Sequence, residues 1–419
     1  MNAEHKRGTT VAFLMDEVTL PPDPINLKAY YLTQEMIRRG LSVFWLRFGR
    51  GSTPNQRDGI MLADIPSSRA RIFSTVFASL RLLKFCAVSR VRLVYCDEWL
   101  FYRRRPLLRV VLQVVLKLGR ISFVLDQRDP YIDMEIADGR IREGNWRHGL
   151  LRWEYGLVYR FSDLIILPSK AYATAMESRG VPKQKLVGEI RGIDRTIFRP
   201  GLDKEVSKVA LGLNGKFVIG WFGHMQKYRQ IKDVIIPLIR TVNNTIPDSY
   251  VLVGGDGPYR KEFDELEHSH PPLPFRFLGP IPHREMPKCI SACDVLLCPV
   301  DTSYQLTLLS APLKILEAVS TGRPIIASRT MVSYVDYAKI EGIIWTGTDL
   351  QSFLVSLSDV YNQYNRFSRQ ALEQAENFAQ FSTGSTIPRL VDIVLSKIAK
   401  GPQESNRELI QEIGGQINS

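Results

Sequence analysis

The chain has 419 residues, of which 45% are hydrophobic and 23% are charged, and its formal net charge is +12. These values exclude a disordered chain and suit two globular domains of about 200 residues each. The sequence shows neither an apolar signal core near its start nor a run of about 20 uncharged apolar residues, so we expect a cytoplasmic protein without a membrane-spanning helix.

Short apolar runs alternate with longer amphipathic stretches in the first half of the chain. The stretch 27–39, which ends before Gly40, predicts a helix. The apolar runs predict strands at residues 11–15, 42–47, 92–96, 121–125 and 163–167. This alternation is typical of parallel strands joined by crossover helices.

The same alternation is clearer in the second half. Strands are predicted at residues 217–222, 250–254, 275–278, 295–299 and 324–328. Helices are predicted at about 232–243, 259–268, 284–292 and 313–321. The pattern indicates an α/β fold with a doubly wound sheet, whose ligand crevice lies at the carboxyl ends of the strands.

A domain boundary is predicted near residues 198–215, where a Pro-Gly break precedes a polar stretch. We expect one Rossmann-like domain over 1–200 and a second over 201–385. Residues 386–400 predict a helix with an apolar stripe, and we consider its return to the N-terminal domain. Residues 401–419 are expected to form a polar, frayed tail.

The positive charge is concentrated in the first domain. Residues 1–200 hold 33 Lys and Arg against 20 Asp and Glu, whereas the remainder holds 22 against 23. The stretch 67–120 carries 12 basic residues and only two acids, with aliphatic and aromatic residues between them. Such a mixture suits an interfacial segment on anionic lipid, or ordinary sheet-covering helices with basic outer faces. Nucleic acid would also explain the charge, but no recognised binding motif accompanies it.

The cysteines indicate reduced thiols rather than a disulfide framework or a metal site. Their number is odd and their density low, and no His or Cys pair stands nearby at zinc-finger spacing. The donor half also has no Asp-x-Asp pair at a strand end, so we expect no metal. The five residues are Cys86, Cys96, Cys289, Cys293 and Cys298.

Several stretches of the second half together resemble the retaining nucleotide-sugar glycosyltransferases of family four. They are residues 192–200, 219–224, 253–258, 277–282, 291–295 and 311–324. The resemblance implies a GT-B fold, with two Rossmann-like domains facing across a cleft. It also implies transfer of a sugar from a nucleotide-sugar donor with retention of configuration and without a cofactor. By family analogy the acceptor belongs to cell-surface polysaccharide or glycolipid assembly, which would place the protein peripherally on the inner face of the membrane.

The helix predicted at 313–321 is suited to a nucleotide diphosphate. The turn with Pro312 and Leu313 brings backbone N–H groups to the helix start, and Lys314 adds a positive charge. Glu317 lies one turn further, where a carboxylate can accept two hydrogen bonds from a ribose diol. The resemblance makes Glu317 the ribose-binding residue; the alternative is a solvent-facing helix glutamate.

The loop after the first donor-domain strand is expected to neutralise the phosphates. By resemblance, His224 occupies the usual arginine position and Arg229 the usual lysine position, next to Gly223. Arg229 would bind phosphate and stabilise the charge that develops on the leaving diphosphate, and the alternative is a surface cation. His224 would bind fully only when protonated, so donor affinity would fall as pH rises. Gly255 belongs to a tight turn that lines the same crevice.

One position departs from the family pattern. The family often has a sugar-contacting glutamate eight residues before the ribose glutamate, and Leu309 stands there. The leucine indicates either a different donor sugar or a degraded site. It therefore keeps open two alternatives, namely a sugar-nucleotide epimerase or phosphorylase and a relative that binds nucleotide sugars without catalysis.

Acceptor-side candidates lie in two segments of the first domain. Asn26 and Lys28 open the first predicted helix, after a loop with three prolines and no glycine. Arg128 and Asp129 follow the predicted strand at 121–125, where polar groups face the ligand crevice of this architecture. Asp129 is our candidate catalytic contact with acceptor or sugar, and the alternative is a cap of the turn before Pro130. By resemblance, the leaving phosphate itself accepts the acceptor's proton.

Overall fold

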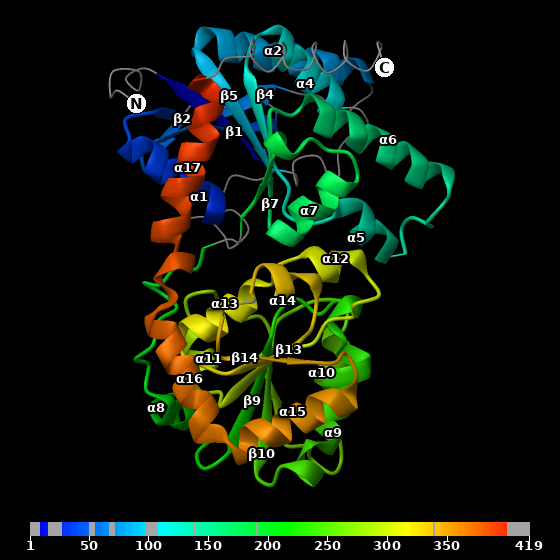
Figure 1. The fold of residues 1–419 in the computed structure, drawn as a ribbon, viewed down its shortest axis with the longest axis vertical. Coiled ribbons are helices and arrows are strands. Elements are labelled where there is room, and N and C mark those ends of the chain that lie inside the picture. Colours follow the sequence, from blue (N-terminus) through cyan, green and yellow to red (C-terminus); the bar gives the residue numbers. More distant parts are fainter. Residues whose placement is uncertain are drawn as a thin grey trace. The chain divides into compact units, whose positions relative to one another are not determined.

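The computed structural model describes residues 9–15, 27–49, 55–66, 72–97, 108–137, 139–189, 192–337 and 340–399. The chain divides into two α/β units, each built on its own sheet (Figure 1). Unit 1 takes its described residues from Met1–Ile132, Ile141–Glu189 and Thr386–Ser419, and unit 2 takes them from Asp133–Arg140 and Ile190–Ser385. The predicted α/β class with two Rossmann-like sheets is confirmed.

The sheet of unit 1 has the strand order β3-β4-β2-β1-β5-β6-β7-β8. Neighbouring strands are parallel, except for the antiparallel pair β3 and β4. The strands are β1 (Thr10–Leu14), β2 (Ser42–Gly49), β3 (Asn55–Arg57), β4 (Ile60–Pro66), β5 (Val91–Asp97), β6 (Ser122–Asp126), β7 (Leu164–Leu167) and β8 (Leu186–Gly188). The described helices in this part of the chain are α1 (Leu27–Arg38), α2 (Ile72–Val88), α4 (Leu108–Leu118), α5 (Tyr131–Ala137), α6 (Trp146–Phe161) and α7 (Lys170–Ser178).

One face of this sheet is covered by α1 and by the last helix, α17 (Thr383–Ala399). Leu390 and Val391 of α17 are buried in the same core as Val43 and Trp45 of β2. Arg39, just after α1, also donates to the carbonyl oxygen of Pro388 at 3.0 Å. From Thr386 onward the last helix therefore belongs to unit 1, and the helix begins at Thr383, a few residues earlier than its apolar stripe predicts.

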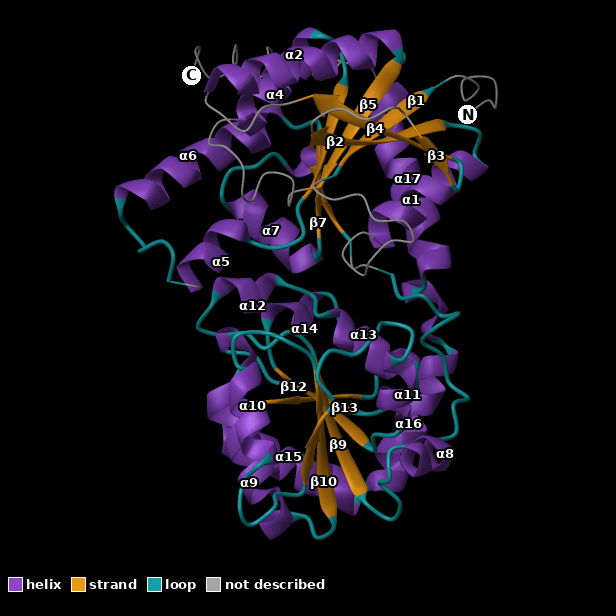
Figure 2. Cartoon of the chain, turned by 180° about the vertical axis from the view of Figure 1, so that it is seen from behind, coloured by secondary structure: helices purple, strands orange, loops and turns teal. Residues whose placement is uncertain are grey.

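The other face of the sheet is covered by α2 and α4, with α6 beside α4 (Figure 2). Phe44 alternates with Val43 and Trp45 along β2, so its side chain points to the opposite face. Its ring meets the ring of Phe85 in α2 edge-on, with 5.1 Å between centroids. The helices of unit 1 therefore form two layers around a buried sheet, as a doubly wound fold requires.

The sheet of unit 2 has six parallel strands in the order β11-β10-β9-β12-β13-β14. They are β9 (Phe217–Phe222), β10 (Ser249–Gly254), β11 (Phe275–Phe277), β12 (Val295–Cys298), β13 (Ile325–Ser328) and β14 (Ile343–Thr346). The helices are α8 (Lys204–Ala210), α9 (Ile236–Thr245), α10 (Arg260–Glu267), α11 (Met286–Ser291), α12 (Gln305–Leu309), α13 (Leu313–Ser320), α14 (Met331–Val335), α15 (Leu350–Asn362) and α16 (Tyr364–Glu376). A π-helical turn, Ile231–Ile235, precedes α9, where an uninterrupted helix was predicted. The strand order reverses between β9 and β12, which is the switch point where such sheets bind ligands.

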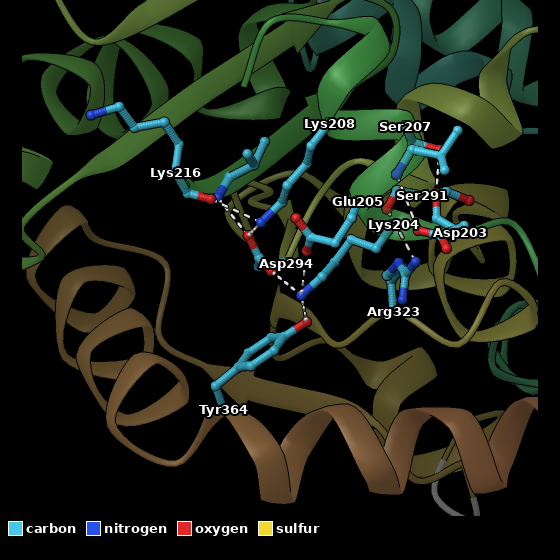
Figure 3. A network of polar contacts seen from close by, with 12 residues as sticks. Asp203, Lys204, Glu205, Ser207, Lys208, Lys216, Ser291, Asp294, Arg323 and Tyr364 are labelled. Carbon is cyan, nitrogen blue, oxygen red and sulfur yellow. Dashed lines mark hydrogen bonds and ion pairs between the residues drawn. The ribbon is translucent and has the colours of Figure 1, made fainter. Parts of the chain in front are cut away.

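A buried charge network fixes the opposite, amino end of this sheet (Figure 3). Asp294, just before β12, accepts hydrogen bonds from Lys208 at 2.6 Å and from the backbone N–H of Val218 at 2.8 Å. Its other oxygen accepts from Lys204 at 2.8 Å, and Lys204 also donates to the hydroxyl of Tyr364 at 3.1 Å. The network ties α8 and α16 to the sheet and lies away from the switch point.

Candidate functional site

Three segments of unit 2 meet at the carboxyl ends of β9 and β10. Gly223 follows β9, and its N–H donates to the carbonyl oxygen of Gly254 at 2.9 Å. A Cβ atom on Gly255 would lie 1.9 Å from the carbonyl oxygen of Gly223, and one on Gly223 would lie 2.6 Å from Nζ of Lys314. The φ angles of +152° and +142° at Gly223 and Gly255 also favour glycine. The fold thus brings together the predicted glycine turns and the first turn of α13.

Lys314 is the most unusual charge in this region. Its Nζ atom is buried, has no hydrogen-bond acceptor among the residues that the structure describes, and lies 4.8 Å from the centre of the Trp221 ring. Burial, together with the positive charge of Arg229, lowers the pKa of Lys314 to about 8. A buried ammonium group without an acceptor is costly, so the site is prepared for an anion that the protein itself does not supply.

Glu317 stands one turn further along α13, on the same side as Lys314. Burial raises the pKa of its carboxyl group to about 7, although the charge of Lys314 acts in the opposite direction. The Glu317 carboxylate receives no hydrogen bond from any residue in the part of the chain that the structure describes. Both side chains line a small pocket whose other walls are apolar: Phe222, Ile290, Leu296, Leu297 and Ile325. Glu317 is thus a half-buried residue that shares a pocket with Lys314.

The start of α13 adds backbone donors to this charge pair. Pro312 is the N-cap residue and provides no side-chain cap, so the first-turn N–H groups of Leu313 and Lys314 remain for a ligand. Leu309, at the usual position of the sugar-contacting glutamate, ends α12 and is buried. This end of the site thus has an ammonium group, a carboxylate and the backbone N–H groups of a helix start, but an apolar side chain at the glutamate position.

Arg229 and His224 lie on the loop between β9 and α9. Arg229 ends a 3-10 turn, Lys227–Arg229, and is half-buried with its guanidinium carbon 5.2 Å from the centre of the Tyr228 ring. The positive charge of Arg229 contributes to the lowered pKa of Lys314. The His224 side chain is exposed. The loop therefore offers one half-buried and one exposed side chain to an anion at the helix start.

Unit 1 has a polar cluster at the carboxyl ends of β5 and β6. Asp126 accepts hydrogen bonds from the Tyr95 hydroxyl at 2.7 Å and from Nζ of Lys28 at 2.7 Å. Arg128 forms a buried ion pair with Asp97. Burial and the adjacent Asp126 raise the pKa of Tyr95 well above its ordinary value. The predicted acceptor-side residues Lys28 and Arg128 thus lie in one cluster, each held by a carboxylate.

Asp129 lies next to this cluster and is half-buried. Its backbone carbonyl accepts from Nε2 of Gln127 at 3.4 Å, and the same amide group donates to the hydroxyl of Tyr172 at 2.8 Å. Asn26, the remaining acceptor-side candidate, lies outside the described residues. The sequence interpretation did not select Asp97 and Asp126, although each is the acidic last residue of a buried strand, which was an available signal.

Other site classes find little support in the described residues. Among them, no group of three or more His, Cys, Asp and Glu side chains could hold a metal ion. None of their helices combines the length and apolar character needed to cross a membrane. All five cysteines are free and buried.

Residues 216–363 match the protein family described as Glycosyl transferases group 1. The sulfoquinovosyl transferase SQD2 of Arabidopsis thaliana is 24% identical over 173 residues, which cover 41% of this chain but only 32% of that protein.

Solved structures match over nearly the whole chain. Sucrose-phosphate synthase from Thermosynechococcus elongatus is 13% identical, with a TM-score of 0.69, and the match covers 94% of this chain and all of that one. HepE of Anabaena in complex with UDP-glucose is 16% identical, with a TM-score of 0.65, and the match covers 92% of this chain and 99% of that one. These similarities show the GT-B fold.

Proposed function

Because residues 216–363 match the family of the group 1 glycosyl transferases, we propose that the chain transfers a sugar from a nucleotide-sugar donor bound in unit 2, with retention of anomeric configuration. The observation that carries this proposal is the buried ammonium group of Lys314, which has no acceptor and lies in the first turn of α13 at the switch point of the sheet. A diphosphate would supply the missing negative charge. The binding of UDP-glucose by HepE is consistent with a donor of this class.

Each part of the donor has a partner in the proposed site. The first-turn N–H groups of Leu313 and Lys314 would hold the diphosphate, and the Lys314 ammonium group would neutralise it. Glu317 would accept hydrogen bonds from the ribose diol. Arg229 and His224 would face the outer phosphate oxygens. When the sugar–phosphate bond breaks, Arg229, Lys314 and the helix start would stabilise the charge on the leaving diphosphate.

The acceptor is proposed to be a saccharide of cell-surface polysaccharide or glycolipid assembly. Support comes from the basic character of residues 67–120, which suits contact with an anionic membrane surface. Asp129 would contact the acceptor or the transferred sugar, with Arg128 and Lys28 beside it. Asp129→Asn should lower the rate of transfer while the affinity for the donor stays unchanged; a loss of donor affinity would assign Asp129 to the donor instead.

The decisive experiment measures binding and slow hydrolysis of a panel of nucleotide sugars. Wild type, Glu317→Ala and a control, Glu265→Ala, would be compared; Glu265 is exposed on α10. We expect one donor to bind and be hydrolysed, with Glu317→Ala lowering its affinity at least tenfold and Glu265→Ala leaving it unchanged. If no nucleotide sugar binds, or if both variants behave like wild type, the donor site is wrongly assigned.

A second candidate function is nucleotide-sugar binding without transfer. It is favoured by buried Leu309, which replaces a sugar-contacting carboxylate with an apolar side chain. Tight donor binding without hydrolysis, and without transfer to any acceptor of a saccharide panel, would support this function over catalysis.

A further inference from the structure

An exposed apolar stripe runs along α6, outside the basic region singled out in the sequence. Trp146 is 73% exposed, Trp153 is 55% exposed, and Leu150 between them is also exposed. Their spacing of four and three residues places them on one side of the helix. Tyr155 and Val158 are buried on the other side of the helix, and Glu154 is buried between the two sides. Two exposed tryptophans on one helix are unusual, because tryptophan is largely buried in most globular proteins.

The neighbouring helices carry similar exposed side chains. Phe77 and Leu80 of α2 are exposed, as is Leu118 at the end of α4. The helix α4 contacts both α2 and α6, and Nε2 of Gln113 in α4 donates to the carbonyl oxygen of Val158 in α6 at 3.1 Å. Figures 1 and 2 show the three helices side by side in unit 1. We call their exposed surface the α2–α4–α6 face.

The charges of this face have one sign. Across the sequences of α2, α4 and α6 the single acidic residue is Glu154, and it is buried. The exposed side chains next to the apolar ones are cationic: Arg81, Lys84, Arg147, Arg152 and Arg160. The Arg147 guanidinium carbon lies 5.5 Å from the centre of the Trp146 ring. Among their described residues, these three helices thus expose tryptophan, leucine and arginine but no carboxylate, a composition that complements a negatively charged apolar boundary.

We propose that the α2–α4–α6 face binds an anionic lipid surface, with Trp146, Leu150 and Trp153 entering the region between headgroups and acyl chains. Tryptophan suits this depth because its ring is apolar while its N–H group still meets water or headgroups. The arginines and Lys84 would contact lipid phosphates. The inference rests on the proposed function, since a lipid-linked acceptor would then be met at the surface to which the enzyme is bound.

The test measures sedimentation of the full chain with vesicles of phosphatidylcholine alone and with added phosphatidylglycerol. We expect binding to the anionic vesicles, weakened by salt, and a blue shift of tryptophan emission on binding. Trp146→Ser with Trp153→Ser should weaken this binding about tenfold or more, because two large apolar side chains no longer enter the lipid. Arg147→Gln with Arg152→Gln should weaken binding to anionic vesicles by a similar factor.

A matched control changes exposed apolar residues elsewhere. Val206→Ser with Val209→Ser alters two exposed side chains of α8 in unit 2 and should leave vesicle binding unchanged. Three results would overturn the inference: no binding to anionic vesicles, equal binding by the tryptophan variant and wild type, or a dimer in solution that the tryptophan substitutions dissociate.

Donor hydrolysis in solution separates this inference from the proposed function. The tryptophan variant should hydrolyse a soluble nucleotide sugar at the wild-type rate, because no donor-site residue is altered. Vesicle binding without donor binding would support lipid binding by the α2–α4–α6 face and reject the transferase proposal. Donor hydrolysis without vesicle binding would support the transferase proposal and reject the lipid-binding surface.

Discussion

The ammonium group of Lys314 lies 4.8 Å from the centre of the Trp221 ring, and no hydrogen-bond acceptor reaches it. The ring face gives some compensation through its negative quadrupole, but much less than a carboxylate would give. An arrangement of this kind lowers stability and is expected where a ligand brings the missing charge. Removal of the ammonium group should therefore raise the stability of the protein and lower its affinity for the donor.

Lys314→Met should stabilise the protein and weaken donor binding. The ammonium group is charged below its folded pKa of about 8, while the unfolded chain keeps the ordinary value of 10.5. The penalty is therefore complete below about pH 8 and fades between pH 8 and 10.5, so the variant should gain up to about 3 kcal/mol at pH 7. Donor affinity should fall roughly tenfold to a hundredfold through loss of a charge-assisted contact. Urea unfolding and calorimetric titration would measure the two effects.

A variant of Lys314 that loses both stability and donor affinity would mean that its side chain is needed for packing rather than for an anion. Lys314→Arg would then fail as well, because the larger guanidinium group does not fit the space beside Gly223.

Donor affinity should depend on pH in a bell-shaped manner. Affinity should rise as Glu317 ionises near its pKa of about 7 and should fall as Lys314 loses its proton near its pKa of about 8. The two limbs reflect the coupled titration of Glu317 and Lys314, so each apparent pKa belongs to the pair rather than to one residue. An intact nucleotide sugar should be used, because the terminal phosphate of a free nucleotide titrates in the same range.

Two substitutions identify the group that is responsible for each limb of this pH profile. Glu317→Gln should remove the rising limb, and Lys314→Met the falling one. If the falling limb remains in Lys314→Met, then a group other than Lys314 controls it. A flat profile between about pH 6 and 9 would reject both assignments.

The sequence predicted the second half of the chain more completely than the first. Strands β9, β10, β12 and β13 are largely apolar runs bounded by Gly or Pro, as buried parallel strands should be, whereas the edge strand β11 has exposed Arg276 at its centre. Strand β14 was missed because Trp345 and its neighbours are only half-buried, although Gly342, with a positive φ angle, immediately precedes the strand. Strands β3, β4 and β8 were missed because they lie toward the edges of the sheet of unit 1, where short polar segments such as Asn55–Arg57 can pair.

Some site residues have a local sequence signal and could be predicted, whereas others are brought together only by the fold. Glycines with a positive φ angle and a helix start leave a local signature, so Gly223, Gly255 and Lys314 could be selected from the sequence. The buried pairs of Asp97 with Arg128 and of Asp126 with Lys28 join residues far apart in the chain, and their pairing depends on strand order. The apolar pocket around Glu317 likewise depends on β12 and β13 lying next to α13.

Gly255→Ala should damage both the fold and the donor site. A methyl group at this position would lie 1.9 Å from the carbonyl oxygen of Gly223, and the φ angle of +142° is poorly suited to alanine. We expect unfolding free energy to fall by about 3 kcal/mol or more. Gly212→Ala is the matched control: its φ angle is +66°, no heavy atom lies within 4 Å of its added methyl group, and a loss of about 1 kcal/mol is expected.

Equal losses for the two glycine variants would show that the turns of β9 and β10 can move apart. In that case the close approach of Gly223 and Gly255 would not be required to position Lys314, and donor affinity should survive in both variants.

Asp294→Ala should destabilise unit 2 without changing the donor site. The substitution leaves Lys204 and Lys208 without their shared carboxylate, and breaking a buried pair of this kind costs about 3–5 kcal/mol. Burial alone would raise the pKa of Asp294, but the hydrogen bonds from Lys204, Lys208 and Val218 outweigh it and lower the pKa. The carboxylate therefore stabilises the fold above its unfolded pKa of about 3.9, and this contribution is lost as pH falls through the lower folded value.

Denaturant unfolding between neutral pH and about pH 3 would test this role of Asp294. The gap in stability between wild type and Asp294→Ala should be large at neutral pH and should shrink below about pH 4. Glu265→Ala, which removes an exposed ion pair with Lys261 on α10, should change stability by less than about 1 kcal/mol at every pH. A gap that stays constant down to the lowest pH would mean that Asp294 acts through packing alone, because an effect of its charge must disappear when the carboxylate is protonated.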